Sequence, residues 1–491
     1  MPTETSRSHP TASPLTRRLI ALLPLGLLVT GCTHLETATA PAEVTALPAT
    51  WSSPTVAQDA AAADVSAALV QWWNRFDDPM LTTLIEAALA HSPDLRTALS
   101  RVEESRARRA AARAQLFPSL SAGVSGSGSR TRNHDTDTTS EYESYGADLN
   151  ASWQVDLFGQ QQKALDASTA DLAQTTANLN AARISLAAEV ATTYVNLRAY
   201  QQRLDVTERS LATRAESTQL TTWREQAGVG DALESRQASA SLEQTRATLP
   251  ALRQTISETR HRLALLCGET PTALDTLLAP TAPVPAPPDD LAISIPAETL
   301  RQRPDVQAAG FAVAAAQART SSARRERLPS LSLSGSLGVD ALKAGDLFSP
   351  TATIGNVVGS LTAPIFDAGR ITQTIRIQDE LTQQALAAYE STVLTALGEV
   401  ENALVAIQRT SEREASLARA TALAREAEAL ARQRYDAGQV DFLTVLDAQR
   451  TLLTLEDSLA TTTADEANAH IQLYLALGGG WSASTTPVTS D

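Results

Sequence analysis

The chain has 491 residues, of which 43% are hydrophobic, 19% are charged and 4% are aromatic, and its formal net charge at pH 7 is -15. This length allows two or three domains, and the apolar fraction is large enough to bury a core. A polytopic helical membrane protein is excluded because no run of roughly 18 apolar residues occurs. The acidic charge argues against a nucleic-acid partner, since binding to phosphates requires a basic surface.

The sequence contains no pattern typical of an enzyme site. The six histidines are isolated from one another, and no HExxH motif or Cys/His cluster has the spacing of metal ligands. A glycine-rich phosphate loop and a nucleophile elbow are also absent. We therefore predict no catalytic residues, no metal and no bound cofactor.

Residues 1–31 are predicted to be a signal peptide. Two arginines precede the apolar stretch Leu19–Val29, which is too short to span a membrane and is soon followed by Cys32. This ending resembles a bacterial lipoprotein signal, in which the Cys32 thiol takes a lipid and the new N-terminus is palmitoylated. Thr33 in place of aspartate favours transfer to the outer membrane. The alternative is an ordinary secretory signal in which the cysteine is incidental.

Two halves of the chain repeat each other. Pro93-Asp94-Leu95 recurs 211 residues later as Pro304-Asp305-Val306, and Ala227-Gly228 recurs 210 residues later as Ala437-Gly438. A match over this distance with one change of register indicates an internal duplication. The predicted segments are a signal peptide at 1–31, a lipidated tether at 32–70, repeat 1 at 71–278, a Pro-rich linker at 279–297, repeat 2 at 298–481 and a tail at 482–491.

Each repeat is predicted to contain a helix, two strands and a pair of long helices that turn near residue 228 or 438. In the first half, Val190, Leu197, Leu204 and Leu211 keep the seven-residue spacing of a coiled coil. The segment from 160 to 224 contains neither proline nor glycine, so one helix could run about 100 Å. The helices alone would also fit a structural coiled-coil rod.

The strands argue against a plain rod. In one of them, Leu331, Leu333, Leu337 and Val339 alternate with serine and glycine, which gives one apolar and one polar face, as in a transmembrane barrel. Four strands cannot close a barrel, so several copies would have to build one together. Two copies would give eight strands and three would give twelve, and the residues alone do not choose. The four strands are predicted at 119–130, 145–155, 330–340 and 354–365.

Seven short motifs then follow one another between Trp72 and Trp481. They are Trp72-Trp73 with Phe76, Asp78-Pro79 and Leu81; Ser92-Pro93-Asp94-Leu95; Trp153 with Asp156-Leu157-Phe158-Gly159; Leu263-Ala264-Leu265-Leu266-Cys267-Gly268; Arg303-Pro304-Asp305; Pro364-Ile365-Phe366-Asp367-Ala368-Gly369-Arg370; and Tyr474-Leu475-Ala476-Leu477-Gly478-Gly479-Gly480-Trp481. In this combination the chain resembles the outer-membrane efflux channels like TolC, in particular their NodT-like lipoprotein branch.

The resemblance implies an α+β membrane protein that assembles as a homotrimer. Three chains with four strands each would form a twelve-stranded outer-membrane β-barrel, continued by a long periplasmic α-helical barrel with a mixed equatorial domain. The implied function is the exit duct of a tripartite efflux system linked to multidrug resistance. Such a duct passively conducts drugs or other small molecules from a proton-driven inner-membrane pump and a periplasmic adaptor (membrane fusion) protein. The alternative is a periplasmic coiled-coil adaptor or scaffold lipoprotein, which would not need four membrane-length strands.

The resemblance also implies a periplasmic gate beside the second turn. Leu443 and Asp447 are four residues apart and share one helical face, which in this family points at the three-fold axis. They would form a leucine ring and a carboxylate ring, with Asp441 as the next candidate for the constriction. The alternative is that Asp447 is a solvated helix residue.

Two further sets of residues are predicted to contact partners. The resemblance places the adaptor contacts at the helix turns, on Gly228, Val229, Gly438 and Gln439. Arginines lie just before the first strand of each half, where they could meet phosphate headgroups of outer-membrane lipids; the alternative is a solvated helix face. These membrane-interface residues are Arg109, Arg113, Arg324 and Arg325.

Overall fold

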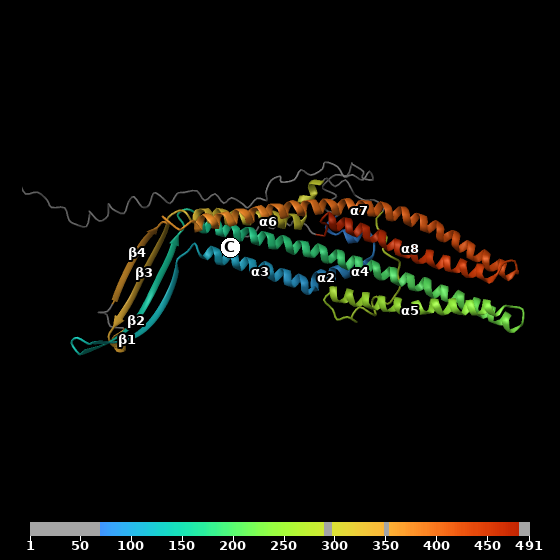
Figure 1. Ribbon diagram of the computed structural model, residues 1–491, viewed down its shortest axis with the longest axis horizontal. Helices are drawn as coiled ribbons and strands as arrows, with labels where there is room; N and C mark the ends of the chain where they lie inside the picture. Colours follow the sequence, from blue (N-terminus) through green and yellow to red (C-terminus); the bar gives the residue numbers. More distant parts are fainter. Residues whose placement is uncertain (1–68, 289–296, 348–352, 481–491) are drawn as a thin grey trace, which may run out of the picture. The chain divides into compact units, whose positions relative to one another are not determined.

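The computed structural model describes residues 69–288, 297–347 and 353–480. The first half contains η1 (Trp72–Phe76), α2 (Pro79–His91), α3 (Pro93–Ala114), β1 (Ser119–Asn133), β2 (Thr138–Val155), α4 (Gln160–Gln226) and α5 (Ala232–Leu266) (Figure 1). The second half contains η2 (Ala297–Gln302), α6 (Pro304–Arg325), β3 (Ser330–Ala341), η3 (Ala344–Asp346), β4 (Thr353–Thr362), α7 (Arg370–Asp436) and α8 (Phe442–Ala476).

The halves match in element length. Helices α3 and α6 have 22 residues each, α4 and α7 have 67, and α5 and α8 have 35. The predicted signal peptide, nearly all of the tether with Cys32, part of the linker and the tail at 482–491 lie outside the described residues. Among the residues that are described, no helix is both long and apolar enough to cross a membrane.

The four strands form one antiparallel sheet in the order β1-β2-β3-β4. The register between β2 and β3 places Leu149 opposite Leu337 and Trp153 opposite Leu333. The predicted apolar faces of the two strands therefore coincide, and side chains on that face, such as Val124 in β1, remain exposed. Within the described residues, β1 and β4 each have one edge without a partner strand.

Three predicted strand boundaries are wrong. Strand β2 begins at Thr138 rather than at 145, and β1 continues to Asn133 rather than 130, because backbone pairing extends beyond the apolar residues from which the strands were predicted. Arg130 and Glu141 face each other there and form an ion pair of 3.2 Å. Strand β4 ends at Thr362 rather than at 365, two residues before Pro364, a residue that cannot donate to a strand ladder.

An aspartate helps to start each long helix. The Asp367 carboxylate accepts hydrogen bonds from the backbone N–H groups of Gly369 (2.9 Å) and Ile371 (2.7 Å). These bonds favour the charged form and hold the pKa of Asp367 below its usual value. In the first half, Asp156 accepts from the N–H of Gln162 at 2.8 Å. Gly159 precedes α4 with φ at +75°, a conformation that favours glycine.

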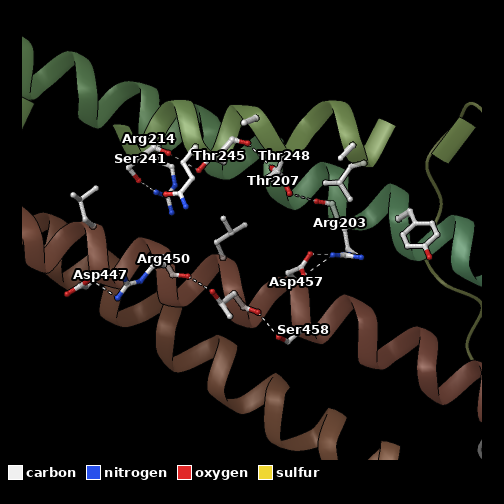
Figure 2. A pocket seen from close by; sticks show the side chains of 18 of the residues that line it. Arg203, Thr207, Arg214, Ser241, Thr245, Thr248, Asp447, Arg450, Asp457 and Ser458 are labelled. Carbon is white, nitrogen blue, oxygen red and sulfur yellow. Dashed lines mark hydrogen bonds and ion pairs between the residues drawn. The ribbon is translucent and has the colours of Figure 1, made fainter. Parts of the chain in front are cut away.

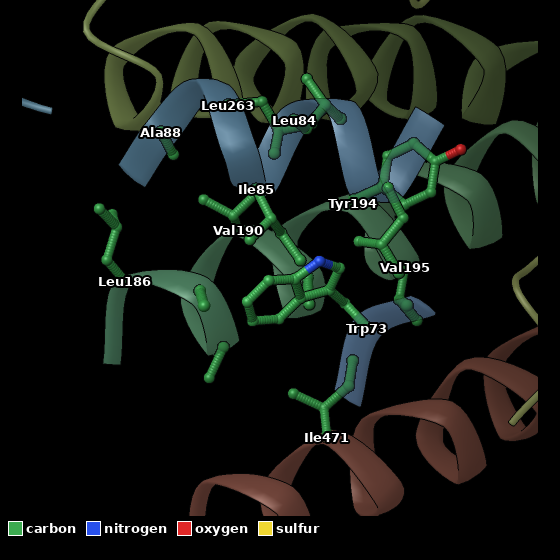
Figure 3. Packing of buried hydrophobic residues seen from close by; sticks show 14 of the residues in the cluster. Trp73, Leu84, Ile85, Ala88, Leu186, Val190, Tyr194, Val195, Leu263 and Ile471 are labelled. Atoms are coloured by element: carbon green, nitrogen blue, oxygen red, sulfur yellow. The ribbon is translucent and has the colours of Figure 1, made fainter. Parts of the chain in front are cut away.

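The largest core cluster surrounds the middle of α4, which contacts α2, α3, α5, α6 and α8. Figure 3 shows Trp73, Ile85, Val190 and Tyr194 packed together in this cluster. The predicted heptad positions follow this packing, since Val190 and Leu197 are fully buried and the next two seam leucines are partly buried. The α4 seam is therefore a core element of the single chain.

The beginning and end of the described chain meet beside this cluster. The Trp72 ring stacks on the Tyr474 ring with centroids 5.3 Å apart, and the N–H of Gly480 donates to the carbonyl of Leu69 at 2.8 Å. Cys267 is buried in the same cluster, where burial raises the pKa of its thiol to about 11. Motif residues from both ends of the sequence thus belong to one packed region.

Candidate functional site

Both predicted helix tips have the same backbone geometry. Gly228 and Gly438 each have φ at +71°, in the left-handed region that favours glycine. In each turn the following residue, Val229 or Gln439, donates its N–H to a carbonyl five residues earlier, at 3.0 and 2.9 Å. These bonds satisfy carbonyls that the helix end would otherwise leave unpaired. All four predicted tip residues are exposed.

The side chains around the two turns differ. Trp223 and Leu233, which were not predicted as tip residues, are exposed beside the first turn. Beside the second turn, Tyr435 and Phe442 are buried in a small apolar cluster that also includes a residue of α5. The Tyr435 hydroxyl donates to Glu234 of α5 at 3.1 Å. The first turn therefore presents more apolar surface than the second.

Asp441 caps helix α8. Its carboxylate accepts hydrogen bonds from the Thr444 N–H at 3.0 Å and the Thr444 hydroxyl at 2.6 Å, and these bonds lower the pKa of Asp441. Asp231 caps α5 in the same way, through the N–H of Leu233 at 2.9 Å. The local structure thus gives Asp441 a capping role, while its part in a constriction stays a prediction.

Leu443 and Asp447 lie along one groove. Phe442 and Val445 are 1% exposed on the packed side of α8, whereas Leu443 is 51% exposed on the other side. The groove has a volume of about 890 Å³ and is bounded by α4, α5 and α8. Both predicted gate residues line it.

Asp447 is paired with an arginine that was not predicted as a site residue. Arg450 Nη2 lies 3.0 Å from Asp447 Oδ1, and both side chains are largely exposed. The spacing of three residues on one helix could have revealed this pair. An exposed pair of this kind contributes about 0–1 kcal/mol, so the carboxylate is partly neutralised without being fixed in place.

Figure 2 shows two more arginines in the groove. Arg203 of α4 forms a two-pronged ion pair with Asp457 of α8, at 2.6 and 3.1 Å. Arg214 of α4 is hydrogen-bonded to the Ser241 hydroxyl of α5. The first contact joins residues 254 positions apart, so no local sequence signal could have found it.

The predicted membrane-interface arginines lie at the ends of α3 and α6 that lead into β1 and β3. Arg109 donates to the Thr169 hydroxyl at 3.1 Å, Arg324 pairs with Asp379 at 2.9 Å, and Arg325 donates to a backbone carbonyl. Arg113 is exposed. Cations are favourable at helix C-termini.

In the part of the chain that the structure describes, no group of three acidic, His or Cys side chains could hold a metal ion.

Known proteins resemble the chain along most of its length. The family model described as "Outer membrane efflux protein" matches residues 84–269 and 295–479. The chain is 33% identical to the pyoverdine export outer membrane protein OpmQ of Pseudomonas putida, over 95% of this chain and 98% of the relative. It is 31% identical to the antibiotic efflux pump outer membrane protein ArpC of the same species, over 96% and 97%.

Solved structures give the same result. The outer-membrane channel OprN is similar with a TM-score of 0.79 and 33% identity, over 90% of this chain and 99% of that one. The outer membrane protein VceC of Vibrio cholerae is similar with a TM-score of 0.75 and 26% identity, over 84% and 99%.

Proposed function

The chain belongs to the outer membrane efflux protein family, and from this premise we propose that it forms a homotrimeric exit duct in the outer membrane. The duct receives small molecules from an inner-membrane pump through a periplasmic adaptor protein and releases them outside. Pyoverdine and antibiotics, named for the two relatives, are candidate classes of exported compound. It conducts passively and catalyses no reaction.

The proposal rests mainly on the open edges and the exposed apolar face of the four-stranded sheet. Its outer strands β1 and β4 have open edges among the described residues, and an apolar face of the sheet is exposed. Unpaired backbone groups are costly in lipid, so such a sheet is stable there only when its edges are paired. Pairing β1 of one copy with β4 of the next closes the sheet, and three copies give the twelve strands that the family resemblance implies. A periplasmic scaffold would have no use for these strands.

Helix α7 supports the same assembly. Leu394, Val405, Leu423 and Leu430 are separated by 11, 18 and 7 residues, which places them on one face of the helix. All four are exposed in the single chain. Apolar side chains that recur along one face of a long helix can pack against a second helix. We assign it to the contact with a neighbouring copy.

The proposed gate and contact surfaces follow from this arrangement. Leu443 and Asp447 narrow the periplasmic end of the duct, with Asp441 beside them, and the two helix turns contact the adaptor. The four arginines at the ends of α3 and α6 lie near the lipid headgroups, where guanidinium groups can bind phosphate. The helical part of the trimer extends into the periplasm.

Cys32 carries a lipid in this proposal. At about 0.8 kcal/mol per buried CH₂, several acyl chains give a permanent anchor. Cys32→Ala should abolish incorporation of labelled palmitate, while the trimer still forms because the strands hold the protein in the membrane. Unchanged labelling of the variant would exclude lipidation at this residue.

The duct is tested by planar-bilayer recording on the purified full-length protein. Leu443→Ala should raise conductance, since it removes an apolar collar that resists wetting. Leu233→Ala is the matched control, because Leu233 is the exposed counterpart of Leu443 at the start of α5. A monomeric protein that conducts in neither form would contradict the proposal.

The membrane strands are tested with neighbouring residues of β3. Leu333→Arg places a charge on the apolar face and should cost about 2–4 kcal/mol near the bilayer midplane, with a lower yield of trimer. Ser334→Arg lies on the opposite face and should assemble normally. Equal assembly of both variants in isolated outer membranes would mean that the apolar face does not contact lipid.

A further inference from the structure

The groove beside α8 contains a buried arginine without a carboxylate partner. Arg214 is only 6% exposed, yet its hydrogen bonds go to two neutral hydroxyls, from Nε to Ser210 at 3.3 Å and from Nη1 to Ser241. Among the described residues it forms no ion pair. Burial, together with the nearby charge of Arg450, lowers the pKa of Arg214. A buried charge is normally paired, because desolvation is otherwise costly.

The other buried arginines of the described chain have their charge accommodated by the protein. Arg303 contacts the carboxylates of Asp305 and Glu399, at 2.7 and 2.8 Å. Arg198 donates to a Gln201 amide oxygen and a backbone carbonyl, and it lies over the Tyr194 ring. Arg214 differs from both because it borders an open cavity. The position of its missing counterion is therefore accessible from solvent.

The charges around the groove favour an anion. Its lining contains three arginines and two aspartates, and no other charged residue. Asp457 pairs with Arg203 and Asp447 pairs with Arg450, so Arg214 is left as the uncompensated charge. Figure 2 shows Arg214 on the α4 and α5 side, with Arg450 on the facing helix α8. Two guanidinium groups from opposite walls can approach one ligand.

We propose that this groove binds an oxyanion between Arg214 and Arg450. The ligand is a carboxylate, phosphate or sulfate group, for which guanidinium donors are well suited. The Ser241 hydroxyl accepts a hydrogen bond from Arg214, so its own proton is available to the same ligand. A volume of about 890 Å³ also admits an organic molecule that carries the anionic group. This site goes beyond the duct function, since it can be occupied whether or not the protein conducts.

Equilibrium dialysis of the detergent-solubilised full-length protein tests the site. Labelled sulfate represents a free inorganic anion and labelled succinate an organic one. At least one of them should bind saturably, with one site per chain. Arg214→Gln should weaken that binding about ten-fold or more, the loss expected for one charge-assisted hydrogen bond. Arg246→Gln is the control, because Arg246 is an exposed arginine of α5 that pairs with Glu243 and does not line the groove.

A second variant tests the site in case Arg214→Gln does not fold. Arg450 is exposed, so Arg450→Gln should leave the fold intact. The variant should still weaken binding, since it removes one of the two guanidinium groups that contact the anion and leaves the charge of Asp447 uncompensated. If neither anion binds to the native protein, or if a folded Arg214→Gln or Arg450→Gln variant binds as tightly as the native protein, the site does not exist.

Discussion

The two long helices α4 and α7 have the same length and lead into the same kind of turn, but their surroundings differ. Helix α4 is packed by five other helices, whereas α7 contacts mainly α6 and α8 and exposes a row of apolar residues. A repeated sequence pattern therefore specifies the same helix twice, and both copies bury heptad residues, while the rest of the chain decides how much of each helix is covered. On α7 the apolar surface remains available for a second molecule.

The largest expected effect lies in the α4 core. Leu197 is fully buried, and Leu197→Ala should lower the free energy of unfolding by about 2–5 kcal/mol because it leaves a cavity. Chemical denaturation followed by circular dichroism measures this loss. A loss below about 1 kcal/mol would mean that Leu197 is not part of a tightly packed core.

The matching change on α7 should act on assembly instead. Leu423→Glu places a charge in the exposed apolar row, so the oligomer should dissociate at a lower temperature while each chain keeps its helical content. Heat-dependent migration in gels, compared with Ala429→Glu at an exposed position about 120° away from Leu423 around the same helix, distinguishes an apolar contact from a general effect of charge. If Leu423→Glu leaves dissociation unchanged, the row is not an interface.

The two helix caps allow a smaller comparison. Asp231→Ala and Asp441→Ala each remove an N-cap and should each cost about 0.5–2 kcal/mol in local stability. Hydrogen exchange in the first turns of α5 and α8 measures both losses. If Asp441 also contributes to a gate, only Asp441→Ala should alter bilayer conductance as well. Identical conductance changes in both variants would restrict Asp441 to its capping role.

The smallest effect concerns two facing positions that are apolar in the first pair of long helices and acidic in the second. Leu204 and Ile256 of the first pair correspond to Glu414 and Glu466 of the second, 210 residues later. Burial, and then the hydrogen bond and charge of Glu414, raise the pKa of Glu466 to about 7. The folded chain therefore holds more protons than the unfolded chain between the ordinary glutamate pKa and about 7, so stability should fall as pH rises through this window.

Replacing both carboxyl groups by the residues of the first pair should remove this dependence. The double variant Glu414→Leu, Glu466→Ile should be more stable than the native protein at pH 8, by less than about 1 kcal/mol because the pair is partly solvated. Thermal unfolding at pH 5 and pH 8 measures the difference. If the native protein and the double variant respond equally to pH, the pKa of Glu466 is not raised.

Much of the fold could be predicted because its signals are local. The heptad of α4, the glycines of both turns and the alternation of β3 each depend on residues close together in sequence. The hairpin extension beyond residue 130 was missed because polar strands pair through their backbones without an apolar pattern. The Arg203–Asp457 contact and the unpaired charge of Arg214 depend on how distant helices meet, and spacing along the chain carries no information about either.

The buried thiol of Cys267 has a practical consequence. Thiolates add to maleimide reagents, and a buried thiol with a pKa of about 11 offers very little thiolate at neutral pH. Because the Cys32 thiol carries a lipid in the proposed function, a cysteine placed at the exposed Val229, or at Leu443, should be modified selectively without first replacing Cys267. Spectroscopic probes and bifunctional cross-linkers can then report distances across the assembled protein, while its largest core cluster keeps its natural packing.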